Sequence, residues 1–423
     1  MLKSKRIPLL KDHHTHPSVY AVLSDCLNLS RASSKEEALL WIRNLSDEIN
    51  IIVGWNNSLY SFDDEELNSF PPVFICNVSF HSFLMNESAK EICSESYEEL
   101  VTNIENQAWV ERNLAEISKF VVNIKQCTKS QLSAFYGYLL QQGVWYVEDM
   151  LLPSNSIAEK LKELGYLERT LLWADMETFN TLDLEAQSNI YGIKLFVDGA
   201  IGAKTAAMKQ PYLTGGRGIL IYSDDELYRI INKSIGIKKP FAIHALGDMA
   251  TEQVINVLFK MKQSCSRMPV VRIEHSQFIS KGNAEKAKSL GIILSMQPNF
   301  SHDSVQYSDR LSEEYLSTNN PFRMLIDEVG YKLGDDLILG SDGMPHGVNY
   351  ALQMSLFPPF PGQKLTLEEF IAGYCMPDME KGYIEVEIDE ENQSVSTKVT
   401  EEPDESCSHV GWAKPGRVGK RAR

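Results

Sequence analysis

Short apolar runs recur along the chain and alternate with stretches of helical periodicity. Strands of a parallel sheet are buried on both faces, so they read as continuous apolar runs. Stretches such as 224–234, 250–262 and 282–290 have the spacing of amphipathic helices. Eight strands alternating with helices are typical of a (β/α)8 TIM barrel, which we predict over residues 7–375. The apolar runs cover residues 7–16, 143–150, 169–175, 190–198, 239–245, 269–276, 290–298 and 336–342.

Residues 17–142 separate the first two runs and are far longer than a connection between a strand and a helix needs. They contain helical and apolar patterns of their own. In a barrel, such an insertion would lie over the C-terminal mouth and shape the substrate pocket. We therefore predict a cap after the first strand, with a separate small domain without catalytic role as the alternative.

The chain changes character after the last apolar run. A helix is predicted at 365–374, and residues 376–399 contain two alternating segments around Asp-Glu-Glu-Asn-Gln. Two such segments around a polar stretch predict a β-hairpin. Residues 400–423 are first acidic and then basic, with Pro and Gly, and we predict that they are disordered.

Composition narrows the class of protein. With 43% hydrophobic and 23% charged residues the chain can bury a sizeable core, and its net charge of -16 argues against binding nucleic acid or acidic membranes. The sequence lacks an apolar stretch long enough for a signal peptide or a bilayer span. Its seven cysteines are scattered and fit free thiols in a reducing compartment. We expect a cytoplasmic protein with a small-molecule substrate and no nucleic-acid or membrane partner; formation of a homo-oligomer is left open.

Candidate metal ligands stand at the ends of the apolar runs. His14 and His16 are two residues apart, so on a strand both side chains leave the same face. Imidazole and carboxylate are ligands that zinc prefers, although iron, manganese or nickel accept the same set. The order along the chain predicts a site for one or two divalent ions, with zinc as the default. The six candidates are His14, His16, Lys194, His244, His275 and Asp342.

The other histidines have no such spacing. His13 alternates away from His14 and is expected to face the helical layer of the barrel. We expect three others, His302, His346 and His409, on the surface or in loops.

Several motifs occur in a fixed order. The most specific is Lys194-Leu-Phe-Val-Asp198-Gly199-Ala-Ile-Gly202-Ala-Lys204-Thr205-Ala206, and the others are Ile243-His244-Ala-Leu-Gly-Asp248, Arg272-Ile-Glu274-His275-Ser-Gln277, Gln297-Pro298, Leu339-Gly-Ser-Asp342, Gly54-Trp55 and His81-Ser-Phe-Leu-Met-Asn86. With these motifs the chain resembles the amidohydrolase superfamily of metal-dependent hydrolases, and in particular the branch that includes N-substituted formamide deformylase.

The chain departs from this family in two places. Few residues precede His13, so we expect the N-terminal half of the family's β-sandwich to be missing and the 376–399 hairpin to be a remnant of it. In the cap, Phe80 and Glu87 replace the usual Gly and Ser, which changes the surroundings of the substrate.

The resemblance also implies roles for individual residues. It implies that Lys194 is carboxylated and bridges two metal ions; an ordinary amine that pairs with Asp198 or orients substrate is the alternative. Asp342 is expected to take a proton from the metal-activated hydroxide and pass it to the leaving amine, or to act as a ligand alone. His81 is expected to stabilise the oxyanion, or to pack as a loop histidine among aromatic residues. Substrate contacts are expected from Asp198, Trp55 and Asn86, with shaping of the turn after the fourth strand as the alternative for Asp198.

The predicted function is hydrolysis of an amide-type C–N bond, other than a peptide bond, in a small molecule. A hydrolase of esters or lactones would use the same site. A degenerate barrel that binds a ligand or partner without catalysis is a further alternative, because the sandwich strands and the cap are altered.

Overall fold

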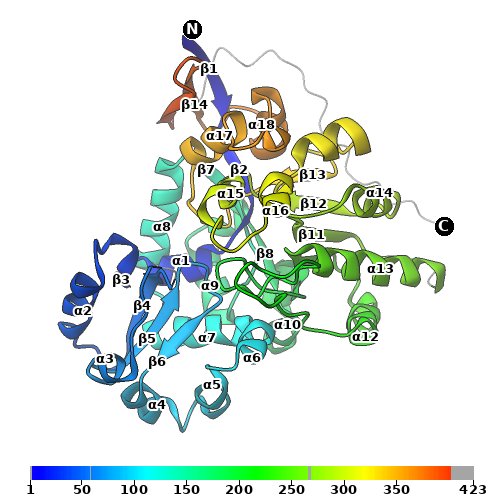
Figure 1. Ribbon diagram of the computed structural model, residues 1–423. Coiled ribbons are helices and arrows are strands. Elements are labelled where there is room, and N and C mark those ends of the chain that lie inside the picture. The colour runs from blue at the N-terminus through cyan, green and yellow to red at the C-terminus, as the bar shows by residue number, and fades with distance from the viewer. Residues whose placement is uncertain (1, 58, 265–267, 402–423) are drawn as a thin grey trace.

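Eight parallel strands form one sheet in the computed structural model, which describes residues 2–57, 59–264 and 268–401 (Figure 1). Their order is β13-β12-β11-β10-β9-β8-β7-β2, so neighbours in the chain are neighbours in the sheet. Each falls inside one of the predicted apolar runs. The strands are β2 (Leu10–Thr15), β7 (Val144–Asp149), β8 (Thr170–Ala174), β9 (Ile190–Phe196), β10 (Phe241–Ala245), β11 (Val271–His275), β12 (Ile293–Met296) and β13 (Leu337–Leu339).

The segment after β13 lies against β2 and brings the two ends of the sheet together. The backbone N–H of Asp342 donates to the carbonyl of His14 at 2.7 Å, and that of Ser341 donates to Oδ1 of Asp12 at 2.9 Å. The sheet therefore curves into a barrel, and the predicted α/β fold class is confirmed. The carboxyl ends of the first and last strands are adjacent, as the predicted metal site requires.

Helices lie between the strands and cover the outside of the sheet (Figure 1). The predicted helices at 224–234, 250–262 and 282–290 are confirmed, with ends shifted by at most two residues. The barrel helices are α9 (Asn155–Glu163), α10 (Met176–Thr181), α11 (Leu184–Asn189), α12 (Asp224–Ser234), α13 (Asp248–Ser264), α14 (Lys281–Ser289), α15 (Asp303–Gln306), α16 (Glu313–Thr318), α17 (Val348–Leu356) and α18 (Leu367–Tyr374).

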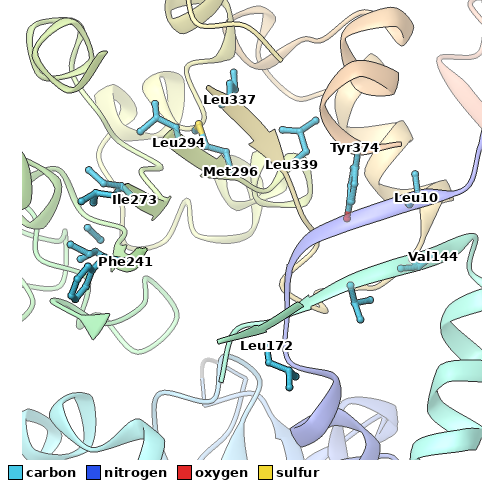
Figure 2. Close-up of a cluster of buried hydrophobic side chains, with 14 of the residues drawn as sticks. Leu10, Val144, Leu172, Phe241, Ile273, Leu294, Met296, Leu337, Leu339 and Tyr374 are labelled. Atoms are coloured by element: carbon cyan, nitrogen blue, oxygen red, sulfur yellow. The ribbon is translucent and has the colours of Figure 1, made fainter. Parts of the chain in front are cut away.

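The main apolar core lies between the strands and these helices. Figure 2 shows its side chains arriving from successive strands, among them Leu10, Leu172, Phe241 and Ile273, all at most 1% exposed. Full burial of such a side chain stabilises the fold by roughly 1.5–3 kcal/mol. Because alternate residues of each strand face this layer, the others face the barrel interior, where the polar candidates lie.

The first apolar run is divided between two sheets. Residues Leu2–Pro8 form β1, which pairs antiparallel with β14 (Tyr383–Asp389), and β14 pairs in turn with β15 (Ser394–Thr400). The predicted hairpin is therefore confirmed, but the expectation that the N-terminal side adds no strand to this sheet is wrong. Both faces of the strand carry basic residues, among them Lys3 and Arg6, which pair with glutamates of or just after β14, and this charge hid its strand character.

The predicted disordered tail begins too early, because Thr400 belongs to β15. Residues 402–423, which include His409, lie outside the described residues.

Residues 17–142 form a smaller sheet of order β3-β4-β5-β6 surrounded by helices, drawn in blue and cyan in Figure 1. Two apolar clusters of its own lie on either side of that sheet. The last helix, α8, instead packs Leu132, Tyr136 and Leu139 into the barrel core, so it belongs with the barrel and not with the predicted cap. The elements are α1 (Pro17–Leu23), β3 (Leu27–Asn28), α2 (Lys35–Arg43), β4 (Asn50–Trp55), α3 (Asp64–Asn68), β5 (Val73–Asn77), β6 (Phe83–Met85), α4 (Glu87–Cys93), α5 (Glu98–Asn103), α6 (Gln107–Arg112), α7 (Leu114–Lys125) and α8 (Lys129–Gln141).

Candidate active site

All six predicted metal-binding residues line one cavity of about 870 Å³ at the carboxyl ends of the strands. The 17–142 segment supplies the opposite wall, through residues such as Val53, Phe80 and His81. In a barrel of this kind, the loops after the strands build the site where chemistry occurs. The arrangement places polar groups from β2, β9, β10, β11 and the loop after β13 around one space.

The carboxylate of Asp342 lies among histidine side chains from two strands. Its Oδ1 is 3.3 Å from Nε2 of His16 and 3.6 Å from Nε2 of His14. One ligand atom each from His14, His275 and Asp342 lie within 4.8 Å of one another. Two imidazoles and a carboxylate at this spacing match the donor set that divalent zinc prefers.

Two buried polar atoms in this cluster have no hydrogen-bond partner among the described residues. They are Nε2 of His14 and Nζ of Lys194. Buried polar atoms are almost always paired, so an unpaired one indicates a group that the protein itself does not supply. The residues present therefore fit a bound cation at His14 and a chemically altered or ligand-bound amine at Lys194.

Hydrogen bonds hold the three buried histidine rings in one orientation each. Nδ1 of His14 donates to Glu274 at 2.5 Å, Nδ1 of His275 donates to Oε1 of Gln297 at 2.8 Å, and Nε2 of His244 donates to the carbonyl of Gly199 at 3.0 Å. The opposite nitrogen of each ring keeps its lone pair. Burial lowers the pKa of all three rings well below the usual value, so they are neutral, as metal ligands must be.

Lys194 is 1% exposed and forms no ion pair with any described residue. Burial lowers the pKa of its amine to about 8, although Glu274 and Asp342 act in the opposite direction. The alternative in which Lys194 pairs with Asp198 is wrong. The Asp198 carboxylate instead accepts three backbone N–H groups, from Ala207, Leu246 and Gly247, at 2.8–2.9 Å.

A chain of charged side chains crosses the barrel beneath the cluster. Arg272 on β11 donates to Glu148 on β7 at 2.7 Å and also to Glu274, which holds His14. Strands β7 and β11 are not neighbours in the sheet, so these groups meet only inside the barrel. His13 joins the same chain, with Nδ1 2.7 Å from Oε1 of Glu148.

The prediction that His13 faces the helical layer is therefore wrong. The pairing of β2 with β7 shifts register between Asp12 and Thr15, which breaks strict alternation at this point. The shift turns His13 toward the barrel interior while His14 and His16 still point to the mouth.

His81 reaches the cavity from the loop between β5 and β6. Its ring centroid is 5.7 Å from that of His244, and its Nδ1 is 2.6 Å from Oε2 of Glu111. Glu111 is fully buried on α6 and is also held by Gln107 at 3.0 Å. Burial lowers the pKa of His81, but Glu111 more than offsets this and raises it overall. Thirty residues separate the two, so no sequence spacing pointed to Glu111.

Three predicted substrate-binding residues lie away from the cavity wall, and the structure corrects their assignment. Nε1 of Trp55 donates to the carbonyl of Tyr60, and its ring packs in an apolar cluster. Asn86 caps α4 and bonds to four further backbone groups. The carboxylate of Asp198 accepts the three backbone N–H groups named above. Their polar atoms stabilise loops, so they have none to offer a substrate.

His346 is in a loop, as expected, but it is buried and lines the cavity. Its Nε2 lies 2.7 Å from the hydroxyl of Thr15, and its ring meets that of Tyr20 edge-on at 5.0 Å. Burial lowers its pKa to about 3, so the ring is neutral. His302 ends a short helical turn at Pro298–His302 beside the same site.

Comparison with known proteins agrees with this geometry. The model of the Amidohydrolase family matches residues 77–351. The Bacillus subtilis protein named "Putative amidohydrolase YtcJ" is 32% identical over 213 residues, which cover 48% of this chain and 39% of that protein. The Arabidopsis thaliana protein LONG AFTER FAR-RED 3 is 23% identical over 391 residues, which cover 79% of this chain and 65% of that protein. The chain thus spans less than two thirds of the length of either relative.

Among solved structures, uncharacterised metal-dependent hydrolases from Pyrococcus horikoshii and Pyrococcus furiosus share the fold. Each superposes with a TM-score of 0.63 at 22% identity, covering 84% and 87% of this chain and 74% and 80% of theirs. The chain belongs to the amidohydrolase family. None of the described helices combines the length and apolar composition needed to cross a bilayer.

Proposed function

We propose that this chain is a metal-dependent hydrolase that cleaves an amide-type C–N bond, other than a peptide bond, in a small molecule. The observation that carries the proposal is the unpaired, buried Nε2 of His14 beside Asp342 and His275. Family membership supports the reaction class, and the cavity volume of about 870 Å³ lies within the range of small-molecule sites.

His14, His16 and Asp342 would hold one divalent ion, and His244 and His275 a second. Zinc suits a donor set that is rich in imidazole. Lys194 would bridge the two as a carbamate, which requires an unprotonated amine to combine with carbon dioxide. Its lowered pKa of about 8 favours that form. When bound, the metal polarises a carbonyl and brings the pKa of water to roughly 7.

The chain's own residues then move protons and hold the substrate. Burial alone would raise the pKa of Asp342, but the neighbouring His14 and His16 outweigh it and lower the pKa to about 2. Asp342 is therefore a carboxylate that accepts the proton of the attacking water and returns it to the leaving nitrogen. His81, kept protonated by Glu111, would donate from Nε2 to the oxyanion.

The substrate body would lie against apolar side chains of α1, α7 and α8, including Leu23, Leu114 and Phe135. N-substituted formamides and other N-acyl amines are the first compounds to test. We also propose a cytoplasmic location, because the five cysteines within the described residues are all free thiols.

Elemental analysis of the purified protein, followed by a panel of amides, formamides, esters and lactones, tests this function. We expect one to two metal ions per chain and turnover of amides. His244→Ala and Asp342→Asn should each lower kcat/KM at least a thousandfold with an unchanged circular dichroism spectrum. Asp335→Asn, at an exposed position before β13, is the matched control and should retain full activity.

Turnover by either site variant at the wild-type rate would contradict the proposal. If esters or lactones are hydrolysed in preference to amides, the proposed bond type is wrong, but the proposed metal site is still supported. Metal-free protein that binds the panel compounds without hydrolysing them would support the degenerate barrel instead.

A further inference from the structure

A second, smaller pocket opens beside the metal cluster. It has a volume of about 80 Å³ and shares His244, His275 and Asp342 with the large cavity. A space of 10–15 Å³ on this measure holds one water molecule, so this pocket accommodates roughly five to eight non-hydrogen atoms. The candidate reaction centre therefore lies between a large space and a small one, and the two ends of a substrate must differ greatly in size.

The wall of the small pocket contains an amide oxygen without a donor and a carboxylate without a counter-ion. Asn299, at 3% exposed, donates from Nδ2 to the carbonyl of Pro345 at 2.8 Å, while its Oδ1 has no partner among the described residues. Asp303 begins α15, and its Oδ2 accepts from Gln277 at 2.7 Å. Within the described parts of the chain, Asp303 forms no ion pair, and burial raises the pKa of its carboxyl to about 7, so a nearby cation would stabilise its ionised form.

The lining of the large cavity differs from that of the small pocket. Around α1, α7 and α8 its wall is built from apolar and aromatic side chains such as Val19, Leu23 and Phe135. A half-buried carboxylate without a counter-ion and a buried amide oxygen without a donor are costly unless a ligand supplies the missing partners. A protonated primary amine offers three N–H groups and the opposite charge, so it satisfies both acceptors at once.

We propose that the small pocket is a subsite for a protonated amino group at the short end of the substrate, bound by Asp303 and Asn299. This inference rests on the proposed amide hydrolysis and adds a substrate class to it. The substrate would be an amide with an apolar body on one side of the scissile bond and a short aminoalkyl group on the other. A short carboxyalkyl group should be rejected by the Asp303 charge.

Two matched pairs of probes test the subsite without assuming which side of the bond enters it. N-(2-aminoethyl)benzamide is compared with N-propylbenzamide, and 3-amino-N-phenylpropanamide with N-phenylbutanamide. In at least one pair, the wild-type holoenzyme should prefer the amino compound by tenfold or more in kcat/KM. N-(carboxymethyl)benzamide should be the poorest substrate of its series.

Asp303→Asn removes the charge but keeps an acceptor for Gln277. It should reduce the preference to threefold or less while hydrolysis of the neutral compounds stays within threefold of wild type, which also shows that the variant folds. Asp335→Asn should leave the preference intact. Equal rates within both pairs for the wild type, or a preference that survives Asp303→Asn, would overturn the subsite while amide hydrolysis stands.

If no amide is hydrolysed, the proposed function fails and the subsite is decided by binding. Calorimetry with the same two pairs and the same variants then applies. Tighter binding of an amino compound that depends on Asp303 would support the subsite, and equal binding within both pairs would reject it.

Discussion

The interior of the barrel has two layers of buried polar groups, and the layers differ in whether these groups have hydrogen-bond partners. In the lower layer, Arg272 lies between Glu148 and Glu274, and His13 is paired with Glu148, so every charged group has a hydrogen-bonded partner. At the mouth, Nε2 of His14 and Nζ of Lys194 are equally buried but have no hydrogen-bond partner among the described residues. Strands β2 and β11 contribute residues to both layers, a few positions apart.

The difference separates structural from functional polar groups. Buried charges that satisfy each other are retained by the fold alone, whereas unsatisfied ones mark where a ligand or reaction enters. His14 belongs to both layers, because its Nδ1 is fixed by Glu274 while its Nε2 faces the cavity. The lower layer therefore orients the upper one.

The largest effect is expected from breaking the lower layer. Arg272→Met leaves Glu148 and Glu274 buried without their cation, and removal of one partner from a buried pair typically costs about 3–5 kcal/mol. Thermal unfolding should show a melting temperature lower by several degrees. Lys281→Met removes an exposed partner of Glu328 and should change stability by less than about 1 kcal/mol. Equal losses of stability in the two variants would contradict the difference that we infer between buried and surface ion pairs.

The mouth is tested by Lys194→Ala. Because Nζ of Lys194 forms no hydrogen bond with a described residue, its loss should leave the fold intact while kcat/KM for an amide falls at least a hundredfold, which corresponds to about 3 kcal/mol. Acetate or propionate should partly restore activity by occupying the place of a carbamate. No rescue, with one metal ion bound, would favour a mononuclear site with an ordinary amine.

The acid stability of the lower layer should depend on Glu148. Burial raises its pKa, but Arg272 and His13 outweigh this and lower the pKa to about 2. A carboxyl with a depressed pKa contributes stability that is complete above about pH 4.5 and is lost as the pH falls toward 2. Glu148→Gln should therefore be less stable at neutral pH and show a shallower loss of stability over this window in urea unfolding. Parallel pH profiles of variant and wild type would contradict the assignment.

The smallest effect is expected at Trp55, which lies outside both layers. Trp55→Phe removes a hydrogen bond to Tyr60 within the 17–142 segment but no group that lines the cavity. We expect kcat/KM within twofold of wild type and a modest loss of stability. A tenfold change in KM would restore Trp55 as a substrate contact.

Local pattern predicted the barrel well because its strands are buried on both faces, and burial leaves a continuous apolar signal in the sequence. It also identified the residues at the strand ends that line the cavity, since ends of parallel strands meet at one edge. The pattern did not predict the strand Leu2–Pro8, which pairs with β14 but carries several basic residues. It failed again for His13, because a register shift cannot be read from alternation.

The sequence by itself determined the fold class and the six side chains that line the mouth, because hydrophobic periodicity and residue type are local properties. Only the tertiary structure decided which buried groups are satisfied. Glu111 beneath His81, Arg272 beneath His14 and Asp303 beside Asn299 depend on partners that are distant in the chain or on the lack of one. Pairing of this kind is set by the closure of the barrel, which brings distant strands within hydrogen-bond distance.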